Sequence, residues 1–383
     1  MNVQACVLAA GLILASGSAM AAPVAATGAP TELTAAQLMD QLGLEESNTA
    51  ARDLPGWHKP NAMVVVVDSP ERLDWFRASL PADVTLWPAK DADDSVIVAD
   101  AHKDTVSAVV GVGCRPDLIA ATPNLHWLQA PFAGIEACAR IPQVRDGSYL
   151  ITNMQGVPSP RIAEHVIAMM FYFARGLDHY AALQRAEQWD RMAVPPSQMW
   201  AVSSKTMLVV GLGTIGINTA RLAHGLGMRV IATRNSKREG PEFVDYVGLS
   251  DELPELLAQA DVVVNALPST AQTRHLFNAA MFARMKRSAL FINVGRGNTV
   301  VTDDLVAALN DGTIAGAGLD VQDPEPVPPG HPLWSAPNLL ITPHSSGFSD
   351  VGQSAYWDVL RENMRRYVAG DKMLSVVDLK RGY

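Results

Sequence analysis

Short runs of apolar residues alternate with segments of helical periodicity along most of the chain. The run from Met63 to Val67 is unbroken and rich in Val, as in strands of a parallel sheet buried on both faces, and the Val-rich segment from Val106 to Gly111 also predicts a strand. The same pattern predicts further strands at 84–87, 96–99 and 125–129, and a helix at 73–80. This alternation predicts an open α/β domain that ends near residue 158.

A second alternating stretch begins at residue 207 and is preceded by a Pro-marked break at Pro158 and Pro160. One long helix is predicted directly after the break, at 161–180, and an amphipathic helix near the C-terminus, at 354–368. Between them we predict strands at 207–210, 229–233, 262–265, 289–293, 315–320 and 339–342, and helices at 219–226, 253–260, 279–285 and 303–310. Strands and helices at this interval are typical of a doubly wound parallel sheet.

The chain of 383 residues is long enough for two domains. The predicted fold class is α/β, with two doubly wound parallel-sheet domains. A Rossmann-like cofactor domain at 159–345 is inserted in a flavodoxin-like substrate domain formed by 60–158 plus 346–383. Residues 22–59 form an N-terminal extension, in which Thr34 and Gln37 have capping-box spacing for one short helix, and no chemistry is assigned to it.

The N-terminus resembles a secretory signal. An apolar run from Val7 to Ala15 precedes Ala19-Met20-Ala21, which has the small residues of a cleavage site. We therefore predict a signal peptide at 1–21 and export, for example to the periplasm. The pattern is imperfect, because no Lys or Arg precedes the apolar run, and a cytoplasmic protein whose true start lies downstream is the alternative. No run is long enough to span a membrane.

Composition narrows the choice of partners and metals. The formal net charge of −9 argues against nucleic acid but permits an anionic small molecule in a locally basic pocket. The three cysteines are Cys6, Cys114 and Cys138, and neither a CxxC pair nor zinc-type Cys/His spacing occurs, so no metal site is expected. Two interpretations of Cys114 and Cys138 stay open, ordinary thiols or a disulfide.

A glycine-rich motif marks the start of the second alternating stretch. Gly211-Leu212-Gly213-Thr214-Ile215-Gly216 follows the strand at 207–210 and leads into a helix. In this context the first glycine permits a tight turn, the second lets backbone amides approach a pyrophosphate, and the third lets helix and strand pack closely. We therefore predict a dinucleotide site.

The next strand bears on which dinucleotide is bound. An acidic residue about 20 positions after the motif would bind the ribose of NAD. The sequence has no carboxylate there but presents Thr233, Arg234, Ser236, Lys237 and Arg238. Because guanidinium, ammonium and hydroxyl groups bind phosphate, NADP(H) is predicted as the preferred cofactor, with NAD(H) possible. The alternative is a solvated basic loop on a protein that accepts either cofactor.

Several ordered motifs follow in the last hundred residues. The chain reads Phe-Ile-Asn-Val-Gly-Arg-Gly from Phe291, Ala-Gly-Leu-Asp-Val from Ala317, Asp-Pro-Glu-Pro from Asp323, His-Pro-Leu-Trp from His331 and Thr-Pro-His from Thr342. With the glycine motif upstream, residues 60 to 370 resemble the D-isomer-specific 2-hydroxyacid dehydrogenases. The resemblance is greatest to the glyoxylate/hydroxypyruvate reductase branch.

This resemblance implies a reaction and roles for particular residues. It implies hydride transfer between NAD(P)H and a small 2-oxoacid or D-2-hydroxyacid. Arg296 would bind the carboxylate and carbonyl oxygens and polarise the ketone. His344 would be the general acid, and Glu325 would pair with it and orient its imidazole. Asp320 would lie beside the nicotinamide.

Other matches to the family imply binding and assembly. Backbone amides at Ala133 and Gly134, in a loop after a strand, would hold the substrate carboxylate. Leu267 and Pro268 would lie beside the adenosine. Asn153 and the segment Ala163-Glu164-His165 would join the two domains. The family also suggests a homodimer, although only loosely.

The sequence departs from the family in one motif and leaves rivals open. Gln322-Asp323-Pro324 replaces a Phe-rich stretch and would alter the wall near Glu325. Formate dehydrogenase is an enzymatic rival, but that branch lacks the glutamate partner of the histidine. An NAD(P)H-sensing, corepressor-like binding protein is a rival of another class. Export itself conflicts with the predicted cofactor, because an exported protein meets little free NADPH.

Overall fold

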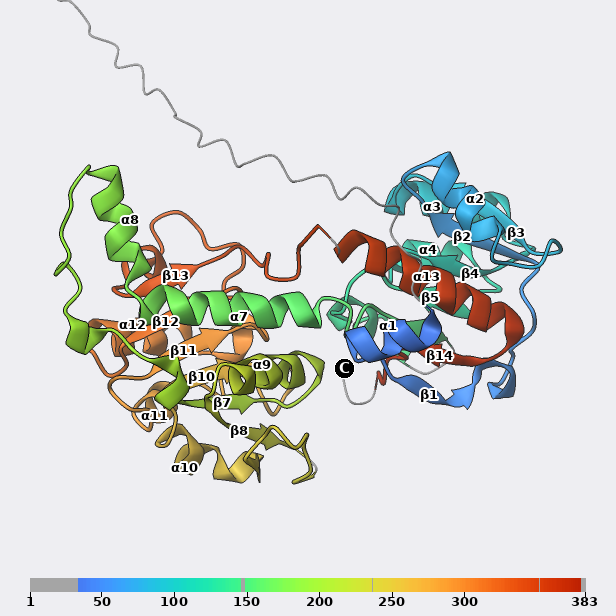
Figure 1. Ribbon diagram of the computed structural model, residues 1–383. Coiled ribbons are helices and arrows are strands. Elements are labelled where there is room, and N and C mark those ends of the chain that lie inside the picture. Colours follow the sequence, from blue (N-terminus) through green and yellow to red (C-terminus); the bar gives the residue numbers. More distant parts are fainter. Residues whose placement is uncertain (1–33, 146–148, 236, 351, 380–383) are drawn as a thin grey trace, which may run out of the picture. The chain divides into compact units, whose positions relative to one another are not determined.

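The computed structural model describes residues 34–383 apart from 146–148, 236, 351 and 380–383 (Figure 1). These residues belong to one compact unit. The unit contains two parallel sheets, which supports the α/β fold class, while the division into domains at 158/159 and 345/346 stays a prediction. The predicted signal peptide at 1–21 lies outside the described residues.

The first sheet has five strands in the order β3-β2-β4-β5-β6, all parallel. This is the flavodoxin-like order, as predicted. β4 is buried along its whole length, which explains why it is rich in Val and has no charged residue. The strands are β2 (Ala62–Val66), β3 (Thr85–Ala89), β4 (Val106–Val110), β5 (Trp127–Gln129) and β6 (Leu150–Thr152), and the helices between them are α2 (Pro70–Arg77), α3 (Ala92–Ala101), α4 (Pro116–Ala121), α5 (Glu136–Ala139) and α6 (Pro142–Arg145).

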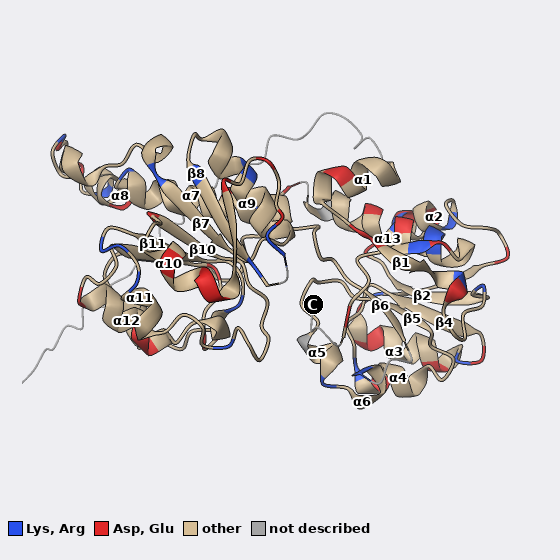
Figure 2. Cartoon of the chain, turned by 90° about the horizontal axis from the view of Figure 1, so that it is seen from below, with Lys and Arg blue, Asp and Glu red and all other residues tan. Residues whose placement is uncertain are grey.

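The second sheet has seven parallel strands in the order β13-β12-β11-β10-β7-β8-β9. The order reverses between β7 and β10, as in a Rossmann fold. The strands are β7 (Thr206–Val210), β8 (Arg229–Arg234), β9 (Tyr246–Leu249), β10 (Val262–Asn265), β11 (Leu290–Asn293), β12 (Gly316–Leu319) and β13 (Leu339–Ile341), and the helices are α7 (Ser159–Ala174), α8 (Leu177–Arg185), α9 (Thr214–Gly225), α10 (Leu253–Leu257), α11 (Ala279–Phe282) and α12 (Thr302–Asn310). Charged residues lie mainly on helices and loops around both sheets (Figure 2).

The structure differs from the sequence predictions at several elements. Residues 96–99 were expected as a strand but lie in α3, because Asp91 caps that helix by accepting from the amide of Asp94 at 2.8 Å. The single helix predicted at 161–180 is two helices, broken at Gly176, which has a φ of +60°. The edge strands β6 and β9 were not predicted, because they have only three and four residues.

The N-terminal extension packs against the C-terminal part of the chain. Its helix α1 (Ala35–Leu42) begins with the predicted capping box, in which Thr34 and Gln37 bond reciprocally. The strand β1 (Glu46–Ala50) pairs antiparallel with β14 (Lys372–Leu374). Leu38 and Leu42 share a core with α13 (Gly352–Ala369). The described part of the extension, from Thr34 onward, therefore belongs to the folded unit.

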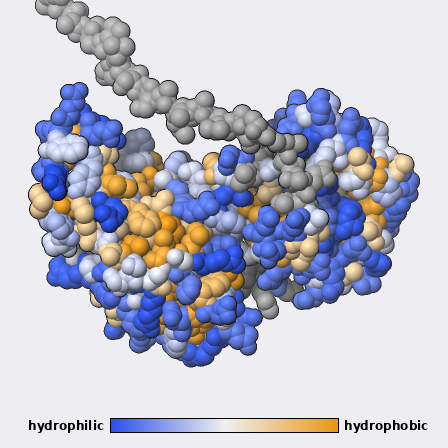
Figure 3. All heavy atoms as spheres, in the orientation of Figure 1, coloured by the Kyte–Doolittle hydropathy of each residue, from blue (hydrophilic) through white to orange (hydrophobic). Residues whose placement is uncertain are grey.

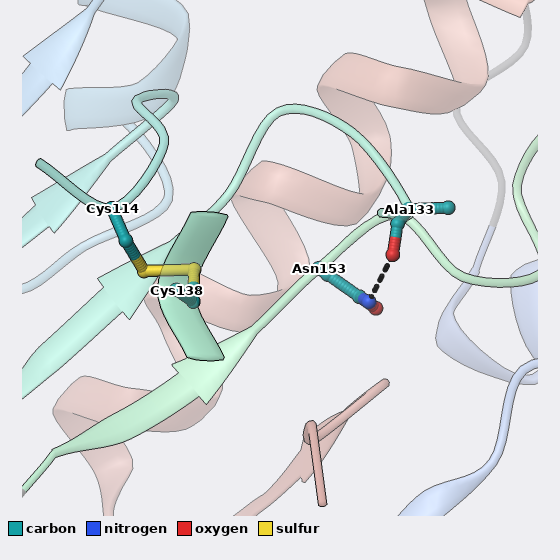
Figure 4. The surroundings of a disulfide bond; sticks show 4 residues. All are labelled: Cys114, Ala133, Cys138 and Asn153. Carbon is teal, nitrogen blue, oxygen red and sulfur yellow. Dashed lines mark hydrogen bonds between the residues drawn. A yellow bond between two sulfur atoms is a disulfide. The ribbon is translucent and has the colours of Figure 1, made fainter. Parts of the chain in front are cut away.

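Cys114 and Cys138 form a disulfide, with 4.9 Å between their Cα atoms. The disulfide interpretation is therefore confirmed, and the interpretation as two ordinary thiols is wrong. Figure 4 shows the bond beside the loop that follows β5. Within the part of the chain that is described, no helix has both the length and the apolar character needed to cross a membrane.

Candidate active site

The glycine motif forms the turn between β7 and α9. Gly211 has a φ of +98°, which favours glycine, and a Cβ on Gly216 would lie 2.2 Å from the carbonyl oxygen of Gly211. A Cβ on Gly213, in contrast, would meet no atom within 4 Å. No described side chain caps α9, whose first turn begins at Thr214 and includes Ile215. The open space and the uncapped amides fit a pyrophosphate at this helix end.

Arg234 at the end of β8 reaches back to this turn. Its Nε and Nη2 donate to the carbonyl oxygen of Leu212 at 3.1 and 2.9 Å, and its Nη1 donates to that of Glu239 at 3.1 Å. The neighbouring Thr233 is only 4% exposed, and its carbonyl oxygen accepts from the Leu212 amide. Arg234 therefore lies against the turn of the glycine motif, whereas the Thr233 side chain is part of the buried strand.

The other basic residues predicted to contact phosphate have different partners. Arg238 lies 2.7 Å from Glu252 and donates to the Tyr246 hydroxyl at 3.1 Å. Hydrogen bonds from Tyr246, from a backbone amide and from Arg238 lower the pKa of Glu252 to about 2, so Glu252 is charged at neutral pH. Lys237 is exposed, 3.8 Å from Glu239. Ser236 lies outside the described residues.

Arg296 lies on a loop after β11 that packs tightly against two other loops. A Cβ on Gly295 would be 2.5 Å from the carbonyl oxygen of Leu267, the residue before Pro268. A Cβ on Gly297 would be 2.0 Å from the carbonyl oxygen of Gln322. The two glycines are therefore required by close backbone approach, and they bring Arg296 next to the loop that leads to Glu325.

Two buried asparagines support the Arg296 loop and were not predicted. Asn265 and Asn293 end the adjacent strands β10 and β11. The Asn265 Nδ2 donates to Asn293 Oδ1 at 3.0 Å and to Thr299 Oγ1 at 2.7 Å. Thr299 Oγ1 in turn donates to the carbonyl oxygen of Arg296 at 2.6 Å. Their position as last residues of neighbouring buried strands is the signal that could have identified them.

Asp320 follows β12 and holds the loop that carries His344. The carboxylate is 1% exposed and accepts from Thr342 Oγ1 at 2.6 Å, from the Ser345 amide at 2.9 Å and from Ser346 Oγ at 2.5 Å. Burial raises the pKa of Asp320, but hydrogen bonds from Ser346, Thr342 and Ser345 outweigh burial and lower it. The described contacts of this carboxylate therefore fix a loop, while its predicted place beside the nicotinamide stays a prediction.

His165 on α7 also belongs to this network. Its Nε2 lies 3.0 Å from Thr342 Oγ1 and 4.0 Å from Asp320 Oδ1. The sequence had suggested only that this segment joins two domains. In the structure it connects α7 to the end of β13, which steadies the segment leading to His344.

His344 and Glu325 form the expected pair. The His344 Nδ1 lies 2.6 Å from Glu325 Oε1, and the two side chains are 51% and 36% exposed. His344 has a φ of +52°, unusual for a residue other than glycine, and its amide donates to the carbonyl oxygen of Asp320 at 2.9 Å. Because Nδ1 is engaged by the carboxylate, Nε2 is the atom that can exchange a proton with a substrate.

The loop that contains Ala133 and Gly134, the predicted substrate loop, follows β5 in the first sheet. The Asn153 Nδ2 donates to the carbonyl oxygen of Ala133 at 2.7 Å (Figure 4). Ala133 and Gly134 are both partly exposed, as backbone groups that receive a ligand must be. Asn153, predicted to join domains, thus also positions this loop. Among the described residues, no group of three or more His, Cys, Asp or Glu could hold a metal ion.

Comparison with known proteins agrees with this geometry. Residues 167–346 match the family model of the D-isomer specific 2-hydroxyacid dehydrogenase, NAD binding domain. A glyoxylate/hydroxypyruvate reductase A from Photorhabdus laumondii is 30% identical over 70% of this chain and 84% of its own length. The chain belongs to the D-isomer-specific 2-hydroxyacid dehydrogenase family. Its members are nicotinamide-dependent oxidoreductases, and the glycine motif, Arg296 and His344 all fall inside the matched region.

Solved structures of this family have the same fold. A D-isomer specific 2-hydroxyacid dehydrogenase from Xanthobacter autotrophicus, in complex with NADPH and MES, has a TM-score of 0.70 and 29% identity, over 85% of this chain and 100% of that one. An NADPH-dependent glyoxylate/hydroxypyruvate reductase from Sinorhizobium meliloti, in complex with NADP and sulfate, has a TM-score of 0.68 and 27% identity, again over 85% and 100%.

Proposed function

We propose that this dehydrogenase reduces small 2-oxoacids, with glyoxylate and hydroxypyruvate as its substrates. The observation that carries the proposal is the His344–Glu325 pair at 2.6 Å, together with the packing of the loop that leads to Glu325 against the Arg296 loop. An acid held by a carboxylate, beside a guanidinium, is what protonation of a ketone and binding of a carboxylate require. The named relatives that act on these two substrates support the choice.

The residues divide the work of the reaction among them. Arg296 binds the 2-oxoacid and draws electron density toward the carbonyl oxygen. His344 donates its Nε2 proton to that oxygen, and Glu325 keeps the imidazole oriented and stabilises its cationic form. A bound nicotinamide cofactor supplies the hydride. No metal is needed for this division, because Arg296 and His344 provide the electrophile and the acid.

NADPH is the proposed preferred cofactor. Support comes from the contact of Arg234 with the glycine motif and from the NADPH and NADP complexes of two relatives. Replacing Arg234 by Ala should raise the KM for NADPH by about 10-fold or more and change the KM for NADH little, because only NADPH carries the 2′-phosphate. Arg229→Ala, which removes an exposed arginine at the opposite end of the same strand, is the matched control. Equal changes in the KM for NADPH and for NADH would show that Arg234 does not recognise the 2′-phosphate.

Export to an oxidising compartment is proposed as well, and because little free NADPH is present there, the protein would be exported with a cofactor bound or with its activity changed. The signal-like residues 1–21 and the Cys114–Cys138 disulfide support it, because disulfides persist mainly outside the reducing cytosol. Fractionation of cells followed by N-terminal sequencing tests it. Mature protein that starts near residue 22 in the exported fraction is the expected result, and protein with Met1 or Asn2 intact in the cytosol would refute export.

A homodimer is the proposed assembly. Apolar side chains gather over α7 and α9 on one face of the molecule (Figure 3), and Leu177, Trp189 and Met192 in and after α8 are 48%, 94% and 63% exposed. Exposed apolar surface of this kind favours a protein contact. Sedimentation equilibrium should give twice the chain mass, and Trp189→Glu should shift the population toward monomer. A monomeric wild type would end the proposal.

Oxidation of NADPH and NADH by the purified protein tests the reaction itself. We expect turnover with glyoxylate and hydroxypyruvate, and formation of the 2-hydroxyacid in equal amount to the cofactor oxidised. Tight cofactor binding without turnover on a panel of 2-oxoacids would instead favour the sensing protein. The named relatives are enzymes, so they do not support that alternative.

A further inference from the structure

The substrate loop is held on one side by β6 and the residues after it. Asn153 donates to the carbonyl oxygen of Ala133 at 2.7 Å, and the Met154 amide donates to that of Phe132 at 3.2 Å. Both contacts act on the backbone immediately before Gly134. This side of the loop therefore depends on ordinary hydrogen bonds, each of which contributes about 1 kcal/mol.

The other side is held by the loop after β4. The Phe132 ring lies so close to Gly113 that a Cβ there would be 2.6 Å from its Cζ. The next residue, Cys114, is bonded to Cys138 in α5, four residues after Gly134 (Figure 4). The two cysteines are 6% and 0% exposed. The only covalent link between the described loops around the substrate site is therefore this disulfide.

The helix that carries Cys138 has little intrinsic stability. α5 has four residues, and no described side chain caps its first turn. A helix this short does not persist without external contacts. Because only a few bonds separate α5 from Gly134, a displacement of α5 is transmitted to the loop. The disulfide is thus well placed to define where the Ala133 and Gly134 amides lie.

We propose that the Cys114–Cys138 disulfide is a redox-sensitive brace that positions the substrate loop. The inference rests on the proposed function and on the family resemblance, which implies that the amides of this loop hold the substrate carboxylate. A dithiol reductant breaks the sulfur–sulfur bond, each cysteine sulfur gains one electron and one proton, and the dithiol becomes a disulfide. Reduction then lowers the affinity for 2-oxoacid and leaves dinucleotide binding, which belongs to the second sheet, unchanged.

The test uses the full chain with Cys6→Ser, so that thiol titration reports only on the pair. The KM for glyoxylate, kcat and the Kd for NADPH are measured before and after dithiothreitol, with the thiol count rising from none to two. We expect the KM to rise between about 5-fold and 100-fold, the upper bound being the effect of a displacement of about 1 Å. The Kd for NADPH should change less than about 2-fold.

A second variant carries Cys114→Ser and Cys138→Ser in addition to Cys6→Ser. It tests the proposal even if dithiothreitol does not reach the buried disulfide. It should have the raised KM and no response to dithiothreitol. The proposal would be overturned if this variant is folded and has the KM of the oxidised protein, with only its melting temperature lowered. The disulfide would then have a structural role alone.

Hydrogen exchange separates failure of the brace from failure of the proposed function. If the brace exists, amides in residues 130–139 exchange faster after reduction, whereas those in β7 and α9 do not, whether or not the protein reduces glyoxylate. Absence of turnover with this exchange pattern would reject the substrate and keep the brace. Turnover with unchanged exchange and unchanged KM would reject the brace and keep the substrate.

Discussion

Gly216→Ala should impair cofactor binding while the protein stays folded. The new Cβ would lie 2.2 Å from the carbonyl oxygen of Gly211, whereas real Cβ contacts are at least 3.0 Å, so α9 and the turn must separate by about 0.8 Å. Such a shift would break at least one of the hydrogen bonds that the amides at this helix end would donate to a bound pyrophosphate. A bond to a charged group contributes about 1.5–3 kcal/mol, which is about 10-fold to 150-fold in the Kd for NADPH.

Gly225→Ala is the matched control for this prediction, because it lies in the same helix and its Cβ would meet no atom within 4 Å. The Kd for NADPH is measured by fluorescence titration, and folding is followed by circular dichroism. The control should bind as the wild type does. If Gly216→Ala binds NADPH within about 2-fold of the wild type, the glycine motif does not position the cofactor and the reasoning fails.

Three further substitutions test the loops around Arg296 and His344. Arg296→Lys should raise the KM for glyoxylate about 10-fold to 100-fold at unchanged Kd for NADPH, because the bidentate contact is lost; an unchanged KM would contradict this role. Glu325→Gln keeps a hydrogen-bond acceptor near His344 but removes the negative charge. Because both side chains are more than one third exposed, we expect the transition state to lose about 1.5 kcal/mol of stabilisation and kcat to fall about 10-fold. An unchanged kcat would exclude the pair from catalysis. Asp320→Asn should lower the free energy of unfolding by about 3 kcal/mol at pH 7. Because the folded state lowers the pKa of Asp320, the carboxylate stabilises the fold at pH values above 3.8, its ordinary pKa, and this stabilisation is lost as the pH falls below 3.8. In urea unfolding, the free energies of wild type and variant should therefore converge in acid.

The parts of the site that are local in sequence could be predicted. The turn from Gly211 to Gly216 depends only on the strand before it and the helix after it. His344 and Glu325 were predicted because their motifs resemble a family, although nothing in the sequence alone brings the two side chains to 2.6 Å. Local sequence pattern and family resemblance are therefore enough to predict a functional residue when one segment, or one known motif, carries the function.

The remaining features depend on contacts between distant segments. Asn265 and Asn293 meet because the sheet places β10 beside β11, which no local pattern reveals. Arg238 pairs with Glu252, next to the short edge strand β9, which was not predicted. Residues 96–99 resemble a strand in sequence because all four are apolar and three are β-branched, whereas the cap at Asp91 decides in favour of a helix.

The central claim is that His344 delivers the proton to a 2-oxoacid held by Arg296. The most direct test is the initial rate of NADPH oxidation with glyoxylate, for wild type and His344→Ala side by side, with the Kd for NADPH measured on both. We predict that kcat falls about 10²-fold to 10⁴-fold, the contribution of a positioned general acid, while the Kd is unchanged. A variant whose kcat stays within about 3-fold of the wild type would contradict the account.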